Sequence, residues 1–355
     1  MNKLLKKFVE LMPENVDGCI IFSEENRRYF TGFPSSDGVL IASKNGCVYF
    51  EDGRYIEAAQ SEVTACEVRL LKRLDLQLPE IIEELKIKTL AVEVSKISLE
   101  RFLFLQKICK DTEVVSSDEC EKIIIKMRSE KTKTELQKMK KAQAIAEQGF
   151  EYILKEISTE KTERELALML DFFMMKNGAE APAFETILIS GAATSKPHGV
   201  PSDEKVKNGF ITMDFGAQID GYKSDMTRTV AIGSLSSKQI EVYETVLKAQ
   251  SAALKKAGKN VKCSDVDFAA RKVIEDAGYG EYFTHANGHS VGLEIHESPN
   301  CSPRSTAVLN VGNIMTVEPG IYIPENFGVR IEDMIYITEN GIENLTHAPK
   351  ELIIL

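Results

Sequence analysis

Five residues that lie far apart in the chain have side chains of the types that bind divalent metal ions in proteins. They are Asp214, Asp225, His289, Glu318 and Glu332. Together they supply one imidazole and four carboxylates, and two divalent cations balance four negative charges, so a buried site of this composition carries little net charge. The absence of thiols favours Mn²⁺, Co²⁺ or Zn²⁺ over a structural zinc bound by cysteines. Two such ions about 3.5–4 Å apart generate a hydroxide at neutral pH and stabilise a developing oxyanion.

Two of these carboxylates belong to a predicted β-hairpin, residues 210–232. The dipeptide Asp220-Gly221 suits a two-residue turn with positive φ. This turn sets a register with the pairs Ile219–Tyr222, Phe215–Met226, Gly216–Asp225 and Asp214–Thr227. Because side chains alternate across a strand, one face is apolar and the other carries Asp214 and Asp225. The two aspartates are then diagonal neighbours, about 7–8 Å apart at the backbone, with Gly216 leaving room beside them.

Each candidate ligand also has an ordinary structural explanation when it is taken singly. Two close carboxylates repel one another unless a proton or a cation lies between them, but most aspartate pairs lie on a solvated face of an edge hairpin. His289 stands near glycines, as loop histidines do, and Glu318 precedes Pro319-Gly320, where a glutamate is usually exposed. The set of five therefore indicates a metal centre more strongly than any one member.

Composition limits the class of protein. The chain has 355 residues, 43% of them hydrophobic and 28% charged, which is enough for two domains with separate cores. A net charge of −10 argues against nucleic acid or an anionic membrane as a partner. Seven cysteines without a Cys-x-x-Cys motif are typical of a reducing cytosol. With no signal peptide and no apolar run of about 20 residues, we expect a cytoplasmic protein.

The first domain, predicted over residues 1–125, alternates short apolar strands with helical patterns. Strands are expected at residues 19–22, 39–42, 48–50 and 89–92, and helices at 76–85 and 99–109. This alternation predicts an α/β domain around a largely buried sheet. The domain has no glycine-rich phosphate loop, so its sequence shows no chemistry of its own.

The second domain, predicted over residues 126–355, groups its helices and antiparallel strands in blocks, which indicates an α+β fold. Thr162 and Glu165 form a capping box that opens a helix. The other expected elements are a mixed-charge strand or helix at 121–128, helices at 129–157 and 237–257, a strand at 186–189 with a loop at 190–199, and a helix from Ser264 capped by Asp267.

The order of several motifs resembles a known family. Met213-Asp214-Phe-Gly, Asp225-Met-Thr-Arg-Thr, Gly288-His289, Glu318-Pro-Gly and Arg330-Ile-Glu332-Asp333 resemble the Xaa-Pro peptidases, aminopeptidase P and prolidase, of the creatinase or pita-bread superfamily. Pro197-His198-Gly199 and His296-Glu297 match the same pattern. In the first domain, Arg28-Tyr-Phe-Thr-Gly-Phe33 and Asp52-Gly-Arg-Tyr55 resemble the creatinase-type N-terminal domain. The resemblance covers nearly the whole chain and implies an α/β N-terminal domain followed by an α+β pita-bread catalytic domain.

The resemblance also implies a role for each metal ligand. Asp214 would chelate one metal ion, and Asp225 and Glu332 would bridge both. His289 and Glu318 would bind the other ion. The chain departs from the usual family pattern at the position after His289, where a serine replaces glycine.

Four residues would act on the substrate according to the same resemblance. His198 and His296 would hold the substrate or its tetrahedral intermediate, and Glu318 would also transfer a proton. Arg330 would support the metal ligands or pair with a substrate carboxylate. In an unbroken strand His289 and His296 would face opposite ways, so both can serve only if Gly292 interrupts the strand.

The implied function is hydrolysis of the bond between an N-terminal residue and a following proline. It would require two divalent ions, with Mn²⁺ expected and Co²⁺ or Zn²⁺ as alternatives, and it would act on small peptides with proline second. The family also implies a homodimer. Whether the chain is a dipeptidase or an aminopeptidase acting on longer peptides stays open.

Other functions are weaker alternatives. A catalytically silent pita-bread binding module, or a metal-free creatinase, would not need all five ligands. A methionine aminopeptidase usually lacks such an N-terminal domain. A two-metal phosphoesterase would need arginines and lysines beside the motifs to receive a phosphate.

Overall fold

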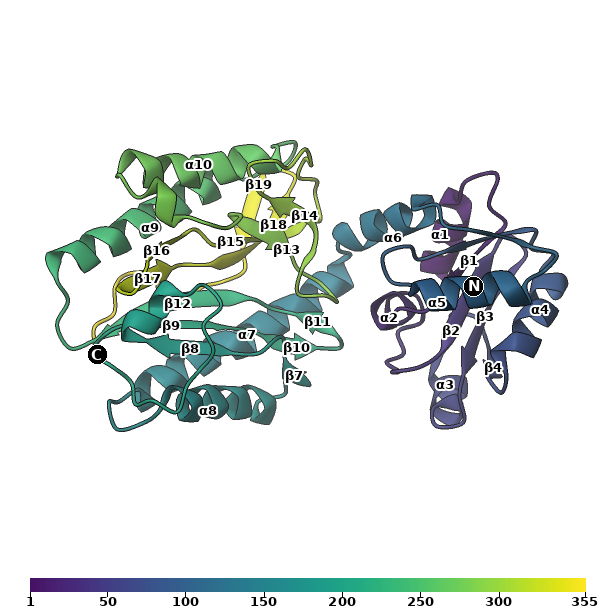
Figure 1. The fold of residues 1–355 in the computed structure, drawn as a ribbon, viewed down its shortest axis with the longest axis horizontal. Coiled ribbons are helices and arrows are strands. Elements are labelled where there is room, and N and C mark those ends of the chain that lie inside the picture. The colour runs from purple at the N-terminus through teal and green to yellow at the C-terminus, as the bar shows by residue number, and fades with distance from the viewer. The chain divides into compact units, whose positions relative to one another are not determined.

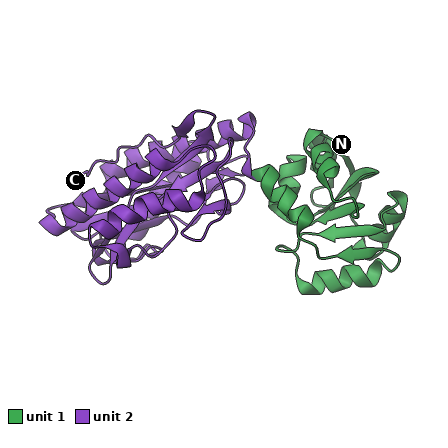
Figure 2. Cartoon of the chain, turned by 90° about the horizontal axis from the view of Figure 1, so that it is seen from above, with its two compact units in different colours: residues 1–128 green, residues 129–355 purple.

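The computed structural model describes residues 1–355, which divide into two compact units, residues 1–128 and residues 129–355 (Figure 2). The boundary predicted after residue 125 falls inside helix α6 (Glu119–Ser129), the helix at which the two units divide. No helix combines the length and the apolar character that a membrane crossing requires.

Unit 1 is built on a six-stranded sheet with the order β4-β3-β2-β1-β5-β6 (Figure 1). Its strands are β1 (Gly18–Ile21), β2 (Val39–Ser43), β3 (Gly46–Glu51), β4 (Glu67–Leu70), β5 (Thr89–Val92) and β6 (Glu113–Val115). Its other helices are α1 (Lys3–Leu11), α2 (Glu24–Thr31), α3 (Ile56–Glu62), α4 (Leu74–Glu84) and α5 (Leu99–Ile108). The four predicted strands are present. The edge strands β4 and β6 escaped prediction because they are short and contain charged residues.

Unit 2 contains two pairs of helices, each packed on its own strands (Figure 1). Helices α7 (Lys133–Glu156) and α8 (Glu163–Lys176) share one core with the sheet β12-β9-β8. Helices α9 (Ser237–Lys256) and α10 (Cys263–Asp276) share a second core with the sheet β14-β13-β15-β18-β19 and the ribbon β16-β17.

The strands of unit 2 are short, and most lie in these layers. They are β7 (Ala181–Pro182), β8 (Ile187–Ser190), β9 (Gly209–Phe215), β10 (Ala217–Ile219), β11 (Tyr222–Lys223), β12 (Met226–Ile232), β13 (Gly288–Ser290), β14 (Glu297–Cys301), β15 (Ile314–Val317), β16 (Gly320–Ile323), β17 (Phe327–Arg330), β18 (Asp333–Thr338) and β19 (Gly341–Asn344). Two short 3₁₀ helices, η1 (Gly191–Ser195) and η2 (Gly280–Tyr282), complete the unit.

The predicted hairpin is present with the predicted register, but it is not continuous. Strands β9 and β12 pair antiparallel, and Asp220 and Gly221 adopt φ values of 47° and 81° at the turn. The pairing is interrupted at Gly216, where an added Cβ would lie 1.9 Å from the carbonyl oxygen of Ser224. Beyond this break, β10 and β11 form a separate sheet with β7. The break places Asp225 immediately before β12 instead of inside it.

One predicted helix cap is wrong. Helix α10 begins at Cys263, and its N-cap residue Lys262 makes no capping bond through its side chain. Asp267 instead lies in the helix, is buried, and forms a bidentate ion pair with Arg271 at 2.8 and 2.9 Å. It also accepts a hydrogen bond from the backbone N–H of Asn287. The Ser264-x-x-Asp267 spacing resembles a capping box, but the aspartate serves the loop that precedes β13.

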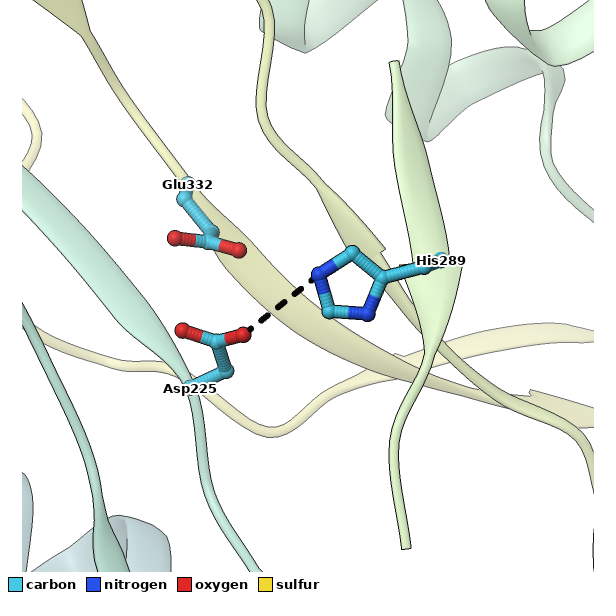
Figure 3. Close-up of side chains that lie close together, drawn as sticks. All are labelled: Asp225, His289 and Glu332. Carbon is cyan, nitrogen blue, oxygen red and sulfur yellow. Dashed lines mark ion pairs between the residues drawn. The ribbon is translucent and has the colours of Figure 1, made fainter. Parts of the chain in front are cut away.

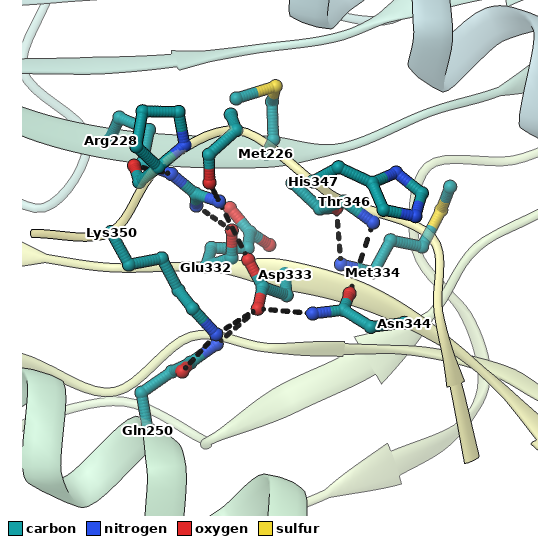
Figure 4. A network of polar contacts seen from close by, with 12 residues as sticks. Met226, Arg228, Gln250, Glu332, Asp333, Met334, Asn344, Thr346, His347 and Lys350 are labelled. Carbon is teal, nitrogen blue, oxygen red and sulfur yellow. Dashed lines mark hydrogen bonds and ion pairs between the residues drawn. The ribbon is translucent and has the colours of Figure 1, made fainter.

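A buried charged network lies next to Glu332, at the start of β18 (Figure 4). Arg228 and Asp333 are 1% and 0% exposed and form an ion pair at 2.8 Å. Arg228 also donates to the backbone carbonyls of Glu332, Ala348 and Pro349. Burial raises the pKa of Asp333, but the charges of Arg228 and Lys350 outweigh burial and lower it. The network therefore fixes the backbone next to Glu332.

We predict that Arg228→Met destabilises unit 2 by about 3–5 kcal/mol, because it leaves Oδ1 of the buried Asp333 and several backbone carbonyls without their donor. The matched control is Arg164→Met, which breaks the exposed pair between Arg164 and Asp203 and should cost less than about 1 kcal/mol. Urea unfolding followed by circular dichroism measures both changes. Equal unfolding midpoints for the two variants would contradict the prediction.

Candidate metal centre and active site

Three of the predicted ligands converge directly. The metal-binding atoms of Asp225, His289 and Glu332 all lie within 4.8 Å of one another, and Figure 3 shows the three side chains pointing into one space. Asp225 precedes β12, His289 is the middle residue of β13, and Glu332 lies between β17 and β18. The backbone N–H of Glu332 donates to the carbonyl of Thr227, so this residue is held against the strand that follows Asp225.

Glu318 and Asp214 complete the set. The Nε2 atom of His289 lies 3.4 Å from Oε1 of Glu318 and 3.6 Å from Oδ2 of Asp225. These separations are short enough for the three side chains to hold one ion together. Asp214 ends β9 and uses Oδ2 to pair with Arg330 at 2.5 Å. Its Oδ1 atom is buried without a hydrogen-bond partner, as expected for an atom that awaits a cation.

Hydroxyl groups of two threonines orient these ligands. Thr316 donates to Oε1 of Glu318 at 3.1 Å and accepts from the backbone N–H of His289 at 3.0 Å. Thr227 donates to Oε2 of Glu332 at 2.6 Å. The Nδ1 atom of His289 lies 3.1 Å from the carbonyl oxygen of Ser290, which favours a proton on Nδ1 and leaves Nε2 free to bind a metal.

The electrostatics of the cluster fit divalent cations. Burial, and then the neighbouring carboxylates, raise the pKa values of Asp225 and Glu332 well above normal. Burial is also the main cause of the raised pKa of Glu318. Burial lowers the pKa of His289, which keeps its imidazole neutral and able to ligate. Four crowded carboxylates, one of which has an unpaired buried oxygen, and one neutral imidazole thus form a set of metal-binding groups whose negative charge cations would neutralise.

All five ligands line one cavity of about 810 Å³, together with His198, His296 and Arg330. The rings of His289 and His296 meet edge to face with their centroids 4.4 Å apart. This contact is possible because β13 ends at Ser290, so the strand is interrupted between the two histidines, as predicted. The Oε1 atom of Glu297 closes this turn by accepting the backbone N–H groups of residues 293 and 294.

Glu297 itself is held by a buried cation. Its Oε2 atom accepts from Nζ of Lys131 at 2.9 Å, and the two side chains are 6% and 1% exposed. Because Glu297 directly follows His296 in the chain, this ion pair fixes the position at which His296 enters the cavity.

All three guanidinium nitrogens of Arg330 donate hydrogen bonds to neighbouring residues. Besides Asp214, it donates to Oγ1 of Thr227, to the carbonyl of Pro197 and to the hydroxyl of Tyr322. Its guanidinium is buried, so its donors stay directed at these partners. This arrangement favours the first of the two predicted roles for Arg330, support of a metal ligand.

Sequence patterns did not identify two residues next to the predicted ligands, His285 and Tyr322. The hydroxyl of Tyr322 lies 2.9 Å from Nε2 of His285, so a chain of contacts runs from His285 through Tyr322 and Arg330 to Asp214. Burial lowers the pKa of His285 and raises that of Tyr322 to about 12. The clustering of four of the five histidines between residues 198 and 296 was a usable signal for His285. Tyr322 gave none, because an aromatic residue in a short strand is ordinary.

Residues 137–339 match Metallopeptidase family M24, and residues 4–129 match the Creatinase/Prolidase N-terminal domain. The chain belongs to metallopeptidase family M24. A Xaa-Pro dipeptidase of Pyrococcus horikoshii is 38% identical over 99% of each protein. Among solved structures, a Xaa-Pro dipeptidase from Bacillus anthracis has a TM-score of 0.95 at 37% identity and 99% coverage of both chains. An X-Pro aminopeptidase from Thermotoga maritima has a TM-score of 0.91 at 35% identity, covering 99% of this chain and 100% of that one.

Membership of the M24 family confirms the predicted fold class, a creatinase-type N-terminal domain followed by a pita-bread catalytic domain. The protein is a metallopeptidase, and the family implies that divalent metal ions bind the catalytic unit. A catalytically silent binding module is not favoured, because all five predicted metal ligands are present and line one cavity.

The raised pKa values predict an unusual pH dependence for the metal-free M24 enzyme. The folded state holds protons on Asp225, Glu318 and Glu332 at pH values where the unfolded chain has released them. These three carboxyl groups therefore contribute a term to the free energy of unfolding that falls as pH rises above about 4, by at most about 1.4 kcal/mol per pH unit for each proton. The lowered pKa values of His285, His289 and His296 contribute a term of opposite sign in the range where histidine titrates. Urea titrations between pH 5 and 8 in chelator would measure this slope.

The variant Asp225→Asn provides the control for that slope. It removes one of the repelling charges, so the metal-free variant should be more stable than the parent at pH 8 and should show a shallower slope. An Asp225→Asn variant with the same stability at pH 8 and the same slope as the parent would contradict the assignment of these carboxylates as crowded and protonated.

Proposed function

We propose that this metallopeptidase hydrolyses the peptide bond between an N-terminal residue and a following proline. The observation that carries the proposal is the convergence of Asp225, His289 and Glu332 on one space, in a cavity that also contains His198 and His296. The Xaa-Pro peptidases named among the similar proteins support the choice of substrate. The cavity of about 810 Å³ is within the range that binds small ligands and accommodates a short peptide.

We propose that two divalent ions are held by Asp214, Asp225, His289, Glu318 and Glu332, with Asp225 and Glu332 shared between them. When bound, the ions would lower the pKa of a water molecule and place positive charge beside the scissile carbonyl. Mn²⁺ is our first choice, with Co²⁺ and Zn²⁺ as alternatives. Mn²⁺ is preferred because the proposed ligands are carboxylate oxygens with a single imidazole nitrogen.

His198 and His296 bind the reacting carbonyl in this proposal. Burial lowers the pKa of His296, so its imidazole is neutral near pH 7 and donates one hydrogen bond. His198 lines the same cavity and is exposed, so a substrate can reach it. Donors placed where negative charge develops stabilise the transition state more than the ground state.

Glu318 moves the proton. One of its oxygens is occupied by Thr316 and lies near His289, which leaves the other free to accept a proton from the attacking water. The leaving group is the nitrogen of proline, which has no hydrogen of its own in the peptide. It must gain a proton to depart, and a carboxyl group with a raised pKa is suited to donate it.

We also propose a cytoplasmic homodimer. All seven cysteines are free, which is the usage of a reducing compartment. The dimer follows from the family resemblance.

Substrate length and metal are tested together. Metal-free protein is reconstituted with Mn²⁺, Co²⁺ or Zn²⁺ and offered a Xaa-Pro dipeptide, a Xaa-Pro-Xaa tripeptide and the matching Xaa-Ala peptides. We expect release of the first residue from the proline peptides only, with the highest rate in Mn²⁺. Full activity in the presence of a chelator, or equal cleavage of the alanine peptides, would overturn the proposal.

Removal of a shared ligand should abolish both metal uptake and turnover. For Asp225→Ala and Glu332→Ala we expect turnover to fall by more than about 10²-fold, since even residues that only orient ligands contribute 10–100-fold. Metal content is measured by atomic emission. Asp276→Ala, which removes an exposed carboxylate on α10, is the control and should retain metal and activity.

A further inference from the structure

The segment Ser190–Ser202 forms the wall of the cavity that carries His198. It follows β8, passes through η1 and continues without regular secondary structure from Lys196. Gly199 and Val200 line the main cavity on one side and a second hollow of about 280 Å³ on the other. A wall with space on both sides needs another feature of the fold to hold its position.

That feature is a single buried carboxylate. Glu163, the first residue of α8, is 3% exposed and accepts four hydrogen bonds. Its Oε1 atom accepts from the backbone N–H and the hydroxyl of Ser190, at 2.7 and 2.8 Å. Its Oε2 atom accepts from the backbone N–H and the hydroxyl of Ser202, at 3.0 and 2.7 Å. Both ends of the wall segment are therefore attached to one side chain.

The start of α8 strengthens this attachment. The first backbone N–H groups of a helix lack partners within the helix, and here those of Glu163 and Arg164 donate to the carbonyls of Glu204 and Ser202. The helix dipole favours a negative charge at this end. The four hydrogen bonds to Glu163 therefore lie at a helix end that suits an acidic side chain.

Contacts in the middle of the segment connect it to the metal centre. The carbonyl of Pro197 accepts from NH1 of Arg330 at 3.1 Å, and Oγ1 of Thr194 accepts from the backbone N–H of Gly328 at 2.9 Å. Pro197 directly precedes His198. The position of the His198 backbone is therefore set by Glu163, which binds both ends of the segment, and by Arg330, which binds the residue before His198.

We propose that Glu163 is a positioning residue that holds His198 in its catalytic location by closing the wall segment at both ends. The inference rests on the role proposed above for His198. It assigns to Glu163 no contact with substrate and no part in metal binding.

The substitution Glu163→Gln tests it. The glutamine oxygen can still accept from one serine, but its NH₂ group cannot accept from the backbone N–H of the other, so one end of the segment is released. We expect kcat to fall about 10–100-fold, as when other groups that orient catalytic residues are lost, with unchanged metal content. The control is Glu165→Gln, an exposed residue in the same helical turn whose carboxylate caps Thr162, which should leave kcat unchanged.

A double-variant cycle separates positioning from general damage. If Glu163 acts through His198, then Glu163→Gln should cost nothing further in a His198→Ala background. A second variant, Ser202→Ala, removes only one of the four donors and should produce a smaller loss in the same direction. It keeps the test available in case Glu163→Gln lowers the folding yield.

A measurement independent of activity uses the five histidines of the chain. In a ¹H–¹⁵N spectrum of histidine-labelled, metal-free protein, Glu163→Gln should shift or broaden the ring signals of His198. The signals of the exposed His347 should not move. Glu165→Gln should change neither residue.

The outcomes distinguish this inference from the proposed function. A fully active His198→Ala variant would refute the role of His198. If that variant is impaired but Glu163→Gln matches Glu165→Gln in kcat and in the His198 signals, the inference about Glu163 is overturned. A full Glu163→Gln loss that persists in the His198→Ala background would also overturn it.

Discussion

Repulsion among buried carboxylates is the interaction on which the catalytic unit depends. Asp214, Asp225, Glu318 and Glu332 face one cavity, and three of them have raised pKa values caused first by burial. Without cations this arrangement opposes folding, because each charge is both desolvated and close to others of its own sign. The strands must therefore be stable enough from other sources to hold the four groups together.

Those other sources surround the ligands. The Arg228–Asp333 pair and the Lys131–Glu297 pair are buried ion pairs adjacent in sequence to a ligand strand and to His296. Thr227 and Thr316 each fix one carboxylate oxygen with a hydroxyl group. These polar contacts replace the rotational freedom of the ligands with a single geometry, which is what a pre-formed metal centre requires.

Much of this centre was predictable because its signals are local. Asp220-Gly221 specifies a turn and hence the register of β9 and β12, and the Thr162–Glu165 pair specifies the start of α8. The five ligands could be chosen because their chemistry is recognisable together. The break at Gly216 was not predictable, since it arises from a close approach of Ser224 that the strand pattern does not encode.

The true role of Asp267 depends on Arg271 and on a distant loop, so spacing alone misassigned it. Tyr322 and Glu163 were missed for a similar reason, because their importance comes from partners far away in the chain.

The two cores of unit 2 give the ligands distinct origins. Asp214 and Asp225 lie in β9 and just before β12, strands that pack on α7 and α8. The other three predicted ligands, His289, Glu318 and Glu332, lie in or next to strands that pack on α9 and α10. Cations bound by both groups would therefore add cross-links between elements that the Arg228–Asp333 pair, and Phe210 and Ala231 in the second core, already join. Binding of the ions and strengthening of the contact between the two groups of elements would then be thermodynamically linked.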